Sequence, residues 1–207
     1  MSKAYSLLGI LILLVLFGAY FAFNRAEAPS PELAEEEESG EEASPSSPMS
    51  LTLSSPSFPN NGDIPEKYTC DGENLNPELR VEGVPEGTES LVLVMDDPDI
   101  PQVFKDQRGI EAFDHWAVYN ISPDTTVIEE GSAVGTEGKN GRGETAYAGP
   151  CPPTEYEPTE HRYSFRLYAL SGTLNFVQTP TLKDIEDAAK GMELDSTTLI
   201  GKYDRAK

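Results

Sequence analysis

The chain has 207 residues, and its 36 Asp and Glu against 15 Lys and Arg give a net charge of -21. Such a charge repels nucleic-acid phosphates, so a general DNA- or RNA-binding protein is excluded. The hydrophobic content of 38% is low for a globular chain, and most of the deficit lies before residue 50. We therefore expect one compact domain preceded by a segment of a different kind.

The first segment is apolar and carries no charge between Lys3 and Arg25. As a helix, this stretch would span about 30 Å, the thickness of the hydrocarbon core of a bilayer. We predict a transmembrane anchor at residues 1–23, with a cleaved secretory signal as the alternative. Because Lys3 precedes the span and few basic residues follow it, we expect the N-terminus inside the cell. The rest would then lie on the extracellular side of the cell membrane, as a single-pass protein or, after cleavage, as a secreted one.

Residues 24–50 are rich in Glu, Pro and Ser, and they hold eight Glu against one Arg. This composition buries too little apolar surface to offset the entropy lost on ordering, so we predict a disordered, extended linker. Residues 51–207 are enough for a single core and form the predicted domain. The domain is acidic in its own right, with 28 Asp and Glu against 13 Lys and Arg in residues 50–207.

Short β-type runs follow one another from residue 50 onward, each bounded by Gly, Pro, Asn or Asp. They cover residues 50–53, 78–81, 90–95, 116–121, 126–128 and 162–170. One helix is predicted at residues 181–190, where three apolar residues share a face and a glycine follows. Residues 194–203 fit either a second helix or a closing strand. The domain is therefore predicted to be mainly β.

The residues able to carry chemistry lie near the ends of these strands. His115 and His161 are the only histidines, and each stands at a strand start beside aromatic residues. Asp97 and Asp99 follow an apolar strand, so they are either binding carboxylates or caps of a turn. Three prolines in residues 149–153 make a stiff loop that suits the wall of a pocket.

Six motifs in this order resemble the phosphatidylethanolamine-binding protein family, specifically its bacterial and archaeal Raf-kinase-inhibitor-like branch. They are residues 68–74 (YTCDGEN), 97–101 (DPDIP), 115–116 (HW) with 118–121 (VYNI), 149–153 (GPCPP), 161–163 (HRY) and 199–203 (LIGKY). The resemblance covers about residues 51–205. It implies an antiparallel β-sandwich, with a large central sheet against a smaller sheet and one or two C-terminal helices.

Members of this family bind anions such as phosphate, acetate or a phospholipid headgroup in a cavity at one end of the sheet. Residue by residue, the resemblance implies that this cavity is lined here by Asp97, Asp99, His115, Gly149, Pro150, His161 and Tyr163. Imidazole and phenol groups donate hydrogen bonds to phosphate oxygens, which gives the set a physical logic. No catalytic residue, metal or cofactor is expected.

Four features depart from the family pattern. Asn76 stands where the family often has Ser, and Ile100 stands where it often has Ala. Asp114 precedes His115 in place of an apolar residue, and the stretch at residues 100–113 is longer than in the most compact members. We expect Ile100 to narrow the mouth of the cavity and Asp114 to place a negative charge beside His115.

Cys70 and Cys151 are the only cysteines, and both fall inside the motifs. An even pair in a domain predicted to face an oxidising exterior favours a disulfide, with two buried free thiols as the alternative. The bond would close a loop of about 80 residues, which contributes about 4 kcal/mol by constraining the unfolded chain.

The expected function is non-catalytic: a domain outside the cell that binds a small anionic or phosphorylated ligand and inhibits a partner enzyme. One alternative is a serine protease inhibitor that acts through its surface, with a protease as partner. Another is a metal-dependent hydrolase using His115, His161, Asp97 and Asp99, although the chain has no nucleophile elbow, Walker loop or zinc-protease motif. A purely structural surface domain is the third. We expect the membrane and a small anion as partners, and no nucleic acid.

Overall fold

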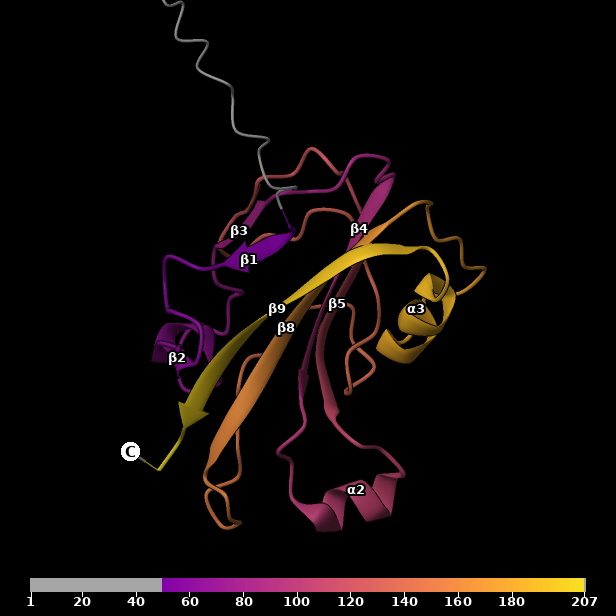
Figure 1. Cartoon of the computed structure of the whole chain (residues 1–207). Coiled ribbons are helices and arrows are strands. Elements are labelled where there is room, and N and C mark those ends of the chain that lie inside the picture. Colours follow the sequence, from indigo (N-terminus) through magenta and orange to yellow (C-terminus); the bar gives the residue numbers. More distant parts are fainter. Residues whose placement is uncertain (1–49, 207) are drawn as a thin grey trace, which may run out of the picture. The chain divides into compact units, whose positions relative to one another are not determined.

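The computed structural model describes residues 50–206, which form two β-sheets with helices around them (Figure 1). The predicted anchor at residues 1–23, and the predicted linker up to residue 49, lie outside the described residues. Within residues 50–206, no helix is both long enough and apolar enough to cross a bilayer.

The large sheet has six strands and carries the candidate site. In order across the sheet they are β2 (Gly62–Asp63), β9 (Glu193–Asp204), β8 (Glu160–Leu170), β4 (Ser90–Asp97), β5 (Phe113–Ile121) and β7 (Thr136–Glu137). β2 pairs parallel with β9, and the other neighbours pair antiparallel. The small sheet is antiparallel, in the order β1 (Thr52–Ser54), β3 (Leu79–Glu82) and β6 (Val127–Ile128).

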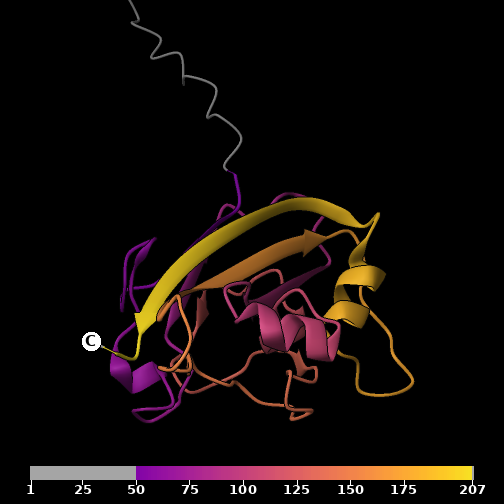
Figure 2. The ribbon, with the colours of Figure 1, turned by 90° about the horizontal axis from the view of Figure 1, so that it is seen from below.

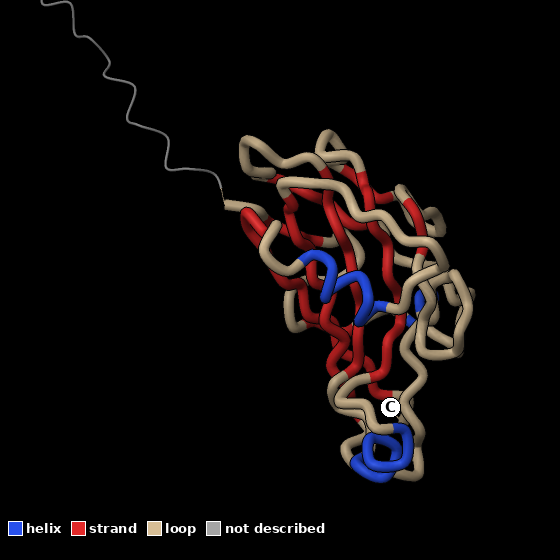
Figure 3. Tube along the Cα trace, turned by 90° about the vertical axis from the view of Figure 1, so that its right-hand side faces the viewer, coloured by secondary structure: helices blue, strands red, loops and turns tan. Residues whose placement is uncertain are grey.

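β4 is buried on both faces, which places it at the centre of the fold. Leu91, Leu93 and Met95 belong to the core that the large sheet shares with the small sheet. Val92 and Val94 point to the opposite face and pack in a second core with helix α3 (Leu182–Ala189). Viewed from the side of α3, this helix lies in front of the strands (Figure 3). A strand covered on both faces has no polar face, so β4 shows an unbroken apolar run in the sequence.

The predicted strands are confirmed as β1, β3, β4, β5, β6 and β8, with ends that differ by up to three residues. The predicted helix at residues 181–190 is α3, which starts with a capping box between Thr181 and Asp184. Residues 194–203 lie within β9, so the closing strand is the correct alternative and the described C-terminal part holds one helix. The mainly β architecture with a large and a small sheet is therefore confirmed.

Four short elements were not predicted: β2, β7, the 3-10 helix η1 (Glu66–Tyr68) and helix α2 (Gln102–Arg108). α2 contains no buried residue, so it shows no apolar face in the sequence. It lies beyond the ends of β4 and β5 in Figure 1, and it comes to the front when the molecule is seen from below in Figure 2. This helix occupies the end of the sheet where the candidate site lies.

Candidate functional site

The ends of three strands meet at one end of the large sheet. β4 ends at Asp97, and its antiparallel neighbours β5 and β8 begin at Phe113 and Glu160. A cavity of about 420 Å³ lies there, within the usual range for small-ligand sites. Its lining residues are Asp97, Ile100, Pro101, Phe104, Arg108, Ile110, Phe113, His115, Gly141, Arg142, Cys151, Pro152, Pro153 and His161. Three of the seven ligand-binding residues expected from the sequence are among them.

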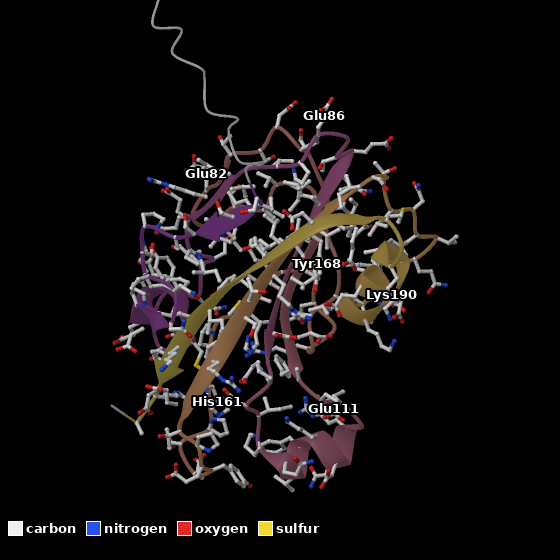
Figure 4. All side chains as sticks on the ribbon, viewed as in Figure 1. Glu82, Glu86, Glu111, His161, Tyr168 and Lys190 are labelled. Carbon is white, nitrogen blue, oxygen red and sulfur yellow. A yellow bond between two sulfur atoms is a disulfide. The ribbon has the colours of Figure 1, made fainter. Side chains whose placement is uncertain are left out.

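Asp97 and His161 form a buried pair in this cavity. Nδ1 of His161 donates a hydrogen bond to Oδ2 of Asp97 at 2.6 Å, and His161 has no exposed surface. Oδ1 of Asp97 accepts the N–H of Asp99 at 2.8 Å, which fixes the carboxylate. Burial lowers the pKa of His161, but the hydrogen bond and charge of Asp97, with the charge of Asp99, raise it above the ordinary value overall. Figure 4 places His161 at the lower end of β8.

The other ring nitrogen of His161 is left for a further partner. Nε2 is buried and makes no hydrogen bond of normal geometry within residues 50–206. A buried polar atom without a partner is costly, since it has lost its hydration without replacement. Because Nδ1 is taken by Asp97, Nε2 is the atom through which His161 can bind a ligand.

His115 lies in the same cavity but has a different protonation state. Its Nδ1 lies 2.5 Å from the carbonyl oxygen of Ala148, and a carbonyl can only accept, so Nδ1 carries the hydrogen. Burial lowers the pKa of His115 to about 4, although Ala148 and Asp97 act in the opposite direction. At pH 7 the ring is therefore neutral, and its Nε2 accepts rather than donates.

Tyr163 stands behind the two imidazoles rather than in the cavity lining. Its ring centroid lies 5.1 Å from that of His115, edge to face, and 6.5 Å from that of His161, nearly parallel. Burial raises the pKa of Tyr163 above its ordinary range, so the hydroxyl stays protonated. The hydroxyl makes no hydrogen bond of normal geometry within residues 50–206. Tyr163 thus supports both rings and keeps a free donor.

Asp99 also lies outside the lining. Its two carboxylate oxygens accept hydrogen bonds from Nε and Nη2 of Arg162 at 2.8 and 2.7 Å, and the N–H of Arg162 donates to it at 2.9 Å. The hydrogen bond from Arg162 lowers the pKa of Asp99, which remains ionised. Asp99 therefore ties the end of β4 to the start of β8 rather than facing the two imidazoles.

Gly149 and Pro150 support the cavity wall from behind. The N–H of Gly149 donates to Oδ1 of Asn74 at 2.8 Å, and the carbonyl of Pro150 accepts the N–H of Cys70 at 3.1 Å. A Cβ at position 149 would lie 2.7 Å from Oδ1 of Asn74, so only glycine fits. A disulfide joins Cys70 to Cys151, as the even cysteine pair favoured. The wall itself is formed by the three residues that follow Pro150.

Asp114 does not lie beside His115, contrary to the expectation from the sequence. It is a residue of β5 and pairs in register with Asp96 on β4. Burial, followed by the charges of Asp96 and Glu186, raises the pKa of Asp114 to about 6, against a smaller opposite effect of Arg166. His115 instead contacts Tyr163, which belongs to the core shared with the small sheet, so Asp114 and His115 are on different sides of the sheet.

Several lining residues were missed because they lie in or after α2, within the stretch noted as longer than usual. Phe104, Arg108, Ile110 and Phe113 all come from this stretch, and Ile100, which was singled out, also lines the cavity. Arg142 comes from the loop after β7 and had no signal in the sequence.

Comparison with known proteins agrees with this architecture. The family model described as phosphatidylethanolamine-binding protein matches residues 54–204. A UPF0098 protein of the archaeon Methanothermobacter thermautotrophicus is 39% identical over 165 residues, covering 75% of this chain and 99% of the relative. A crystal structure of a phosphatidylethanolamine-binding protein homologue from Chlamydia trachomatis is 34% identical, with a TM-score of 0.69 over 76% of this chain and 99% of that chain.

A more distant structure shares the fold alone. Escherichia coli YbcL, described as a new member of the mammalian family, is 22% identical, with a TM-score of 0.64 over 74% of this chain and 98% of its own. The resemblance carried by the six motifs is thus confirmed over nearly the whole described domain. This chain belongs to the phosphatidylethanolamine-binding protein family, among members found in archaea and bacteria.

Proposed function

We propose that the domain is a non-catalytic binding module that holds a small anionic or phosphorylated ligand, of the lipid-headgroup kind, in the cavity at the end of the large sheet. One observation carries the proposal: the buried Asp97–His161 pair leaves Nε2 of His161 without a hydrogen bond of normal geometry in residues 50–206, in a cavity of small-ligand size. When His161 is protonated, Nε2–H is a charged donor, and such a donor favours an anionic acceptor.

His115 makes binding of an anion dependent on pH. Its Nε2 is a bare acceptor in the neutral ring, so an anion beside it favours the imidazolium and raises the pKa from about 4. An anion therefore brings a proton with it when it binds. We infer that affinity rises as the pH falls from 7 toward 5.

The test is a titration of the full chain in detergent with inorganic phosphate and with phosphoethanolamine, followed by NMR of the two histidine rings. We expect saturable shifts at both rings and a higher pKa of His115 in the saturated protein. His161→Gln, which loses the charged donor, should weaken binding about tenfold or more. The control Arg80→Gln removes one charge from an exposed surface pair and should change nothing.

Because His161 is fully buried, Asp97→Asn provides a second variant of unchanged volume. It removes the charge that raises the pKa of His161, so it should weaken phosphate binding at neutral pH and restore part of it at lower pH. Absence of any ring response to either compound, in a chain with native circular dichroism, would contradict the proposed function.

The arrangement of the two histidines and two aspartates does not support the hydrolase alternative. Asp99 is bound to Arg162 instead of facing the imidazoles, and Asp97 is bound to His161. In the part of the chain that the structure describes, no three His, Cys, Asp or Glu side chains are grouped to hold a metal ion.

The proposal also covers where the module acts. An anchor at residues 1–23 holds the domain outside the cell, and there the domain inhibits a partner enzyme such as a serine protease. External protease should then digest the domain on intact cells, and the full chain should slow at least one enzyme of a serine protease panel. Protection of the domain on intact cells would refute the outward placement.

A further inference from the structure

The arginines of the domain divide into two groups. Residues 50–206 hold six, and four of them pair with carboxylates: Arg80 with Glu78, Arg162 with Asp99, Arg166 with Asp96 and Glu186, and Arg205 with Asp71. The other two, Arg108 and Arg142, have no carboxylate partner within this range, and both line the cavity. In a domain with more than twice as many acidic as basic residues, both arginines without a carboxylate partner in the described range line the cavity.

Arg108 is carried to the cavity by α2. The helix is attached near its middle, where Nζ of Lys105 donates to the carbonyl of Pro98 at 2.7 Å. The ring of Phe104 packs edge to face on Tyr156, with 5.4 Å between centroids. These two contacts hold the helix at the end of the sheet (Figure 1). Arg108, in its last turn, is exposed at the rim.

Arg142 is carried by a loop of defined shape. Asn140 is only 5% exposed, and its Oδ1 accepts the N–H of Arg142 at 2.9 Å. Gly141 lies against Phe113, because a Cβ there would be 2.7 Å from the ring. The loop backbone is therefore fixed while the Arg142 side chain is exposed. Burial is the main cause that lowers the pKa of His115, and the positive charge of Arg142 lowers it further.

The cavity thus has three zones. The buried end holds His161 and His115, and the exposed rim holds the two arginines. The rest of the lining is largely apolar, with Ile100, Pro101, Phe104, Ile110, Phe113 and Pro152. Phe113 connects the two ends, because its ring centroid lies 4.9 Å from that of His115 and its ring also lies against Gly141, next to Arg142. A phosphoryl group held by the histidines would leave the arginines to a second charged group, with apolar side chains beside the part of the ligand that joins the two.

We propose that Arg108 and Arg142 bind a second negatively charged group of the ligand, so that the cavity selects anions whose two charged groups are separated by an apolar portion. This inference rests on the proposed function, since it assigns the first anionic group to the Asp97–His161 end. The segment that contains α2 then determines specificity, because residues 100–113 supply one arginine and five of the six apolar residues.

The test compares two probes of nearly equal size, 4-carboxyphenyl phosphate and its methyl ester, titrated into the full chain by calorimetry at neutral pH. Both carry the phosphoryl group and the ring, and only the acid carries the second charge. We expect the acid to bind about tenfold more tightly than the ester, since two exposed charge pairs are gained. Arg108→Gln and Arg142→Gln should each reduce this ratio, because the acid loses its partner for the second charge in addition to any loss of affinity that it shares with the ester.

Arg80→Gln is the control, because it removes an exposed guanidinium that is not in the cavity lining and should keep the ratio. Retained ester binding in the two variants shows that the cavity is still folded. Equal affinity for acid and ester in the unaltered chain, or an unchanged ratio in both variants, overturns this inference while leaving the proposed function standing. If neither probe nor inorganic phosphate binds, both fail together.

Discussion

At the scale of single residues, the two histidines of the chain show how a local partner sets protonation. His161 donates to a carboxylate and is driven toward the cation, whereas His115 donates to a carbonyl in a buried place and stays neutral. The sequence motifs indicated both rings but not this difference. The partner of His115 is the backbone carbonyl of Ala148. A pattern of side chains in the sequence does not indicate which backbone carbonyl accepts a hydrogen bond.

Asp114 gives a prediction about stability against pH. Its pKa is about 6 in the folded protein, against 3.8 for an ordinary Asp, so the folded state holds the proton more tightly. The carboxylate is thus destabilising above pH 6, and this cost decreases as the pH falls through 6 and vanishes below about 4. Asp114→Asn should raise the free energy of unfolding by about 1 kcal/mol at pH 8, allowing for partial exposure.

The measurement is urea unfolding of the full chain, followed by fluorescence of Trp116, the only tryptophan. The gain from Asp114→Asn should disappear at pH 4. Asp124→Asn, on an exposed turn, is the control and should stay within about 0.5 kcal/mol at both pH values. A loss of stability at pH 8 in Asp114→Asn would show that the carboxylate is stabilised by Arg166 instead.

At the scale of elements, success and failure of the sequence predictions have clear causes. β4 was predicted correctly because a strand that is buried on both faces has an uninterrupted apolar run in the sequence. Residues 194–203 were ambiguous because β9 is defined by pairing with β8 along its length, a long-range contact that local pattern does not report. The strand predicted at 116–121 begins at Phe113 in the structure, so Asp114 and His115 are strand residues, which the expected charge beside His115 did not take into account.

The segment that contains Cys151 gives a prediction for the cavity wall. The disulfide to Cys70 spans 81 residues, so its loss should reduce the free energy of unfolding by about 4 kcal/mol. The double variant Cys70→Ser, Cys151→Ser should show this loss in urea unfolding. Reductant should have the same effect on the unaltered chain and none on the double variant. Equal stability of the two proteins would mean that hydrogen bonds at Gly149 and Pro150 hold the wall without the bond.

At the scale of the whole molecule, charge is distributed unevenly in a way that the composition alone conceals. Acidic residues outnumber basic ones by 28 to 13 in residues 50–207, and yet the cavity rim carries two unpaired arginines. The family motifs predicted the buried end of the site, because those residues lie in the motifs. They could not predict the rim, because Arg108 belongs to the additional helix and Arg142 to a loop between motifs.

The excess of acidic residues also gives a prediction about salt. Like charges repel in the compact state, so screening should stabilise the fold. We expect the free energy of unfolding of the full chain to rise by about 1 kcal/mol between about 0.01 M and 0.15 M sodium chloride. A decrease over the same range would show that attractive ion pairs outweigh the repulsion.

The pairing of β8 with β9 has a practical consequence for handling the protein. His161 lies opposite Tyr203, and the last residues of β9 leave the sheet at the cavity end, whereas the chain enters the domain near β1, away from α2 (Figure 1). A purification tag or reporter fused after Lys207 would begin near the ligand entrance. An acidic tag would then compete with anionic ligands for the cavity. Immobilisation on a sensor chip through the N-terminal side leaves that entrance open.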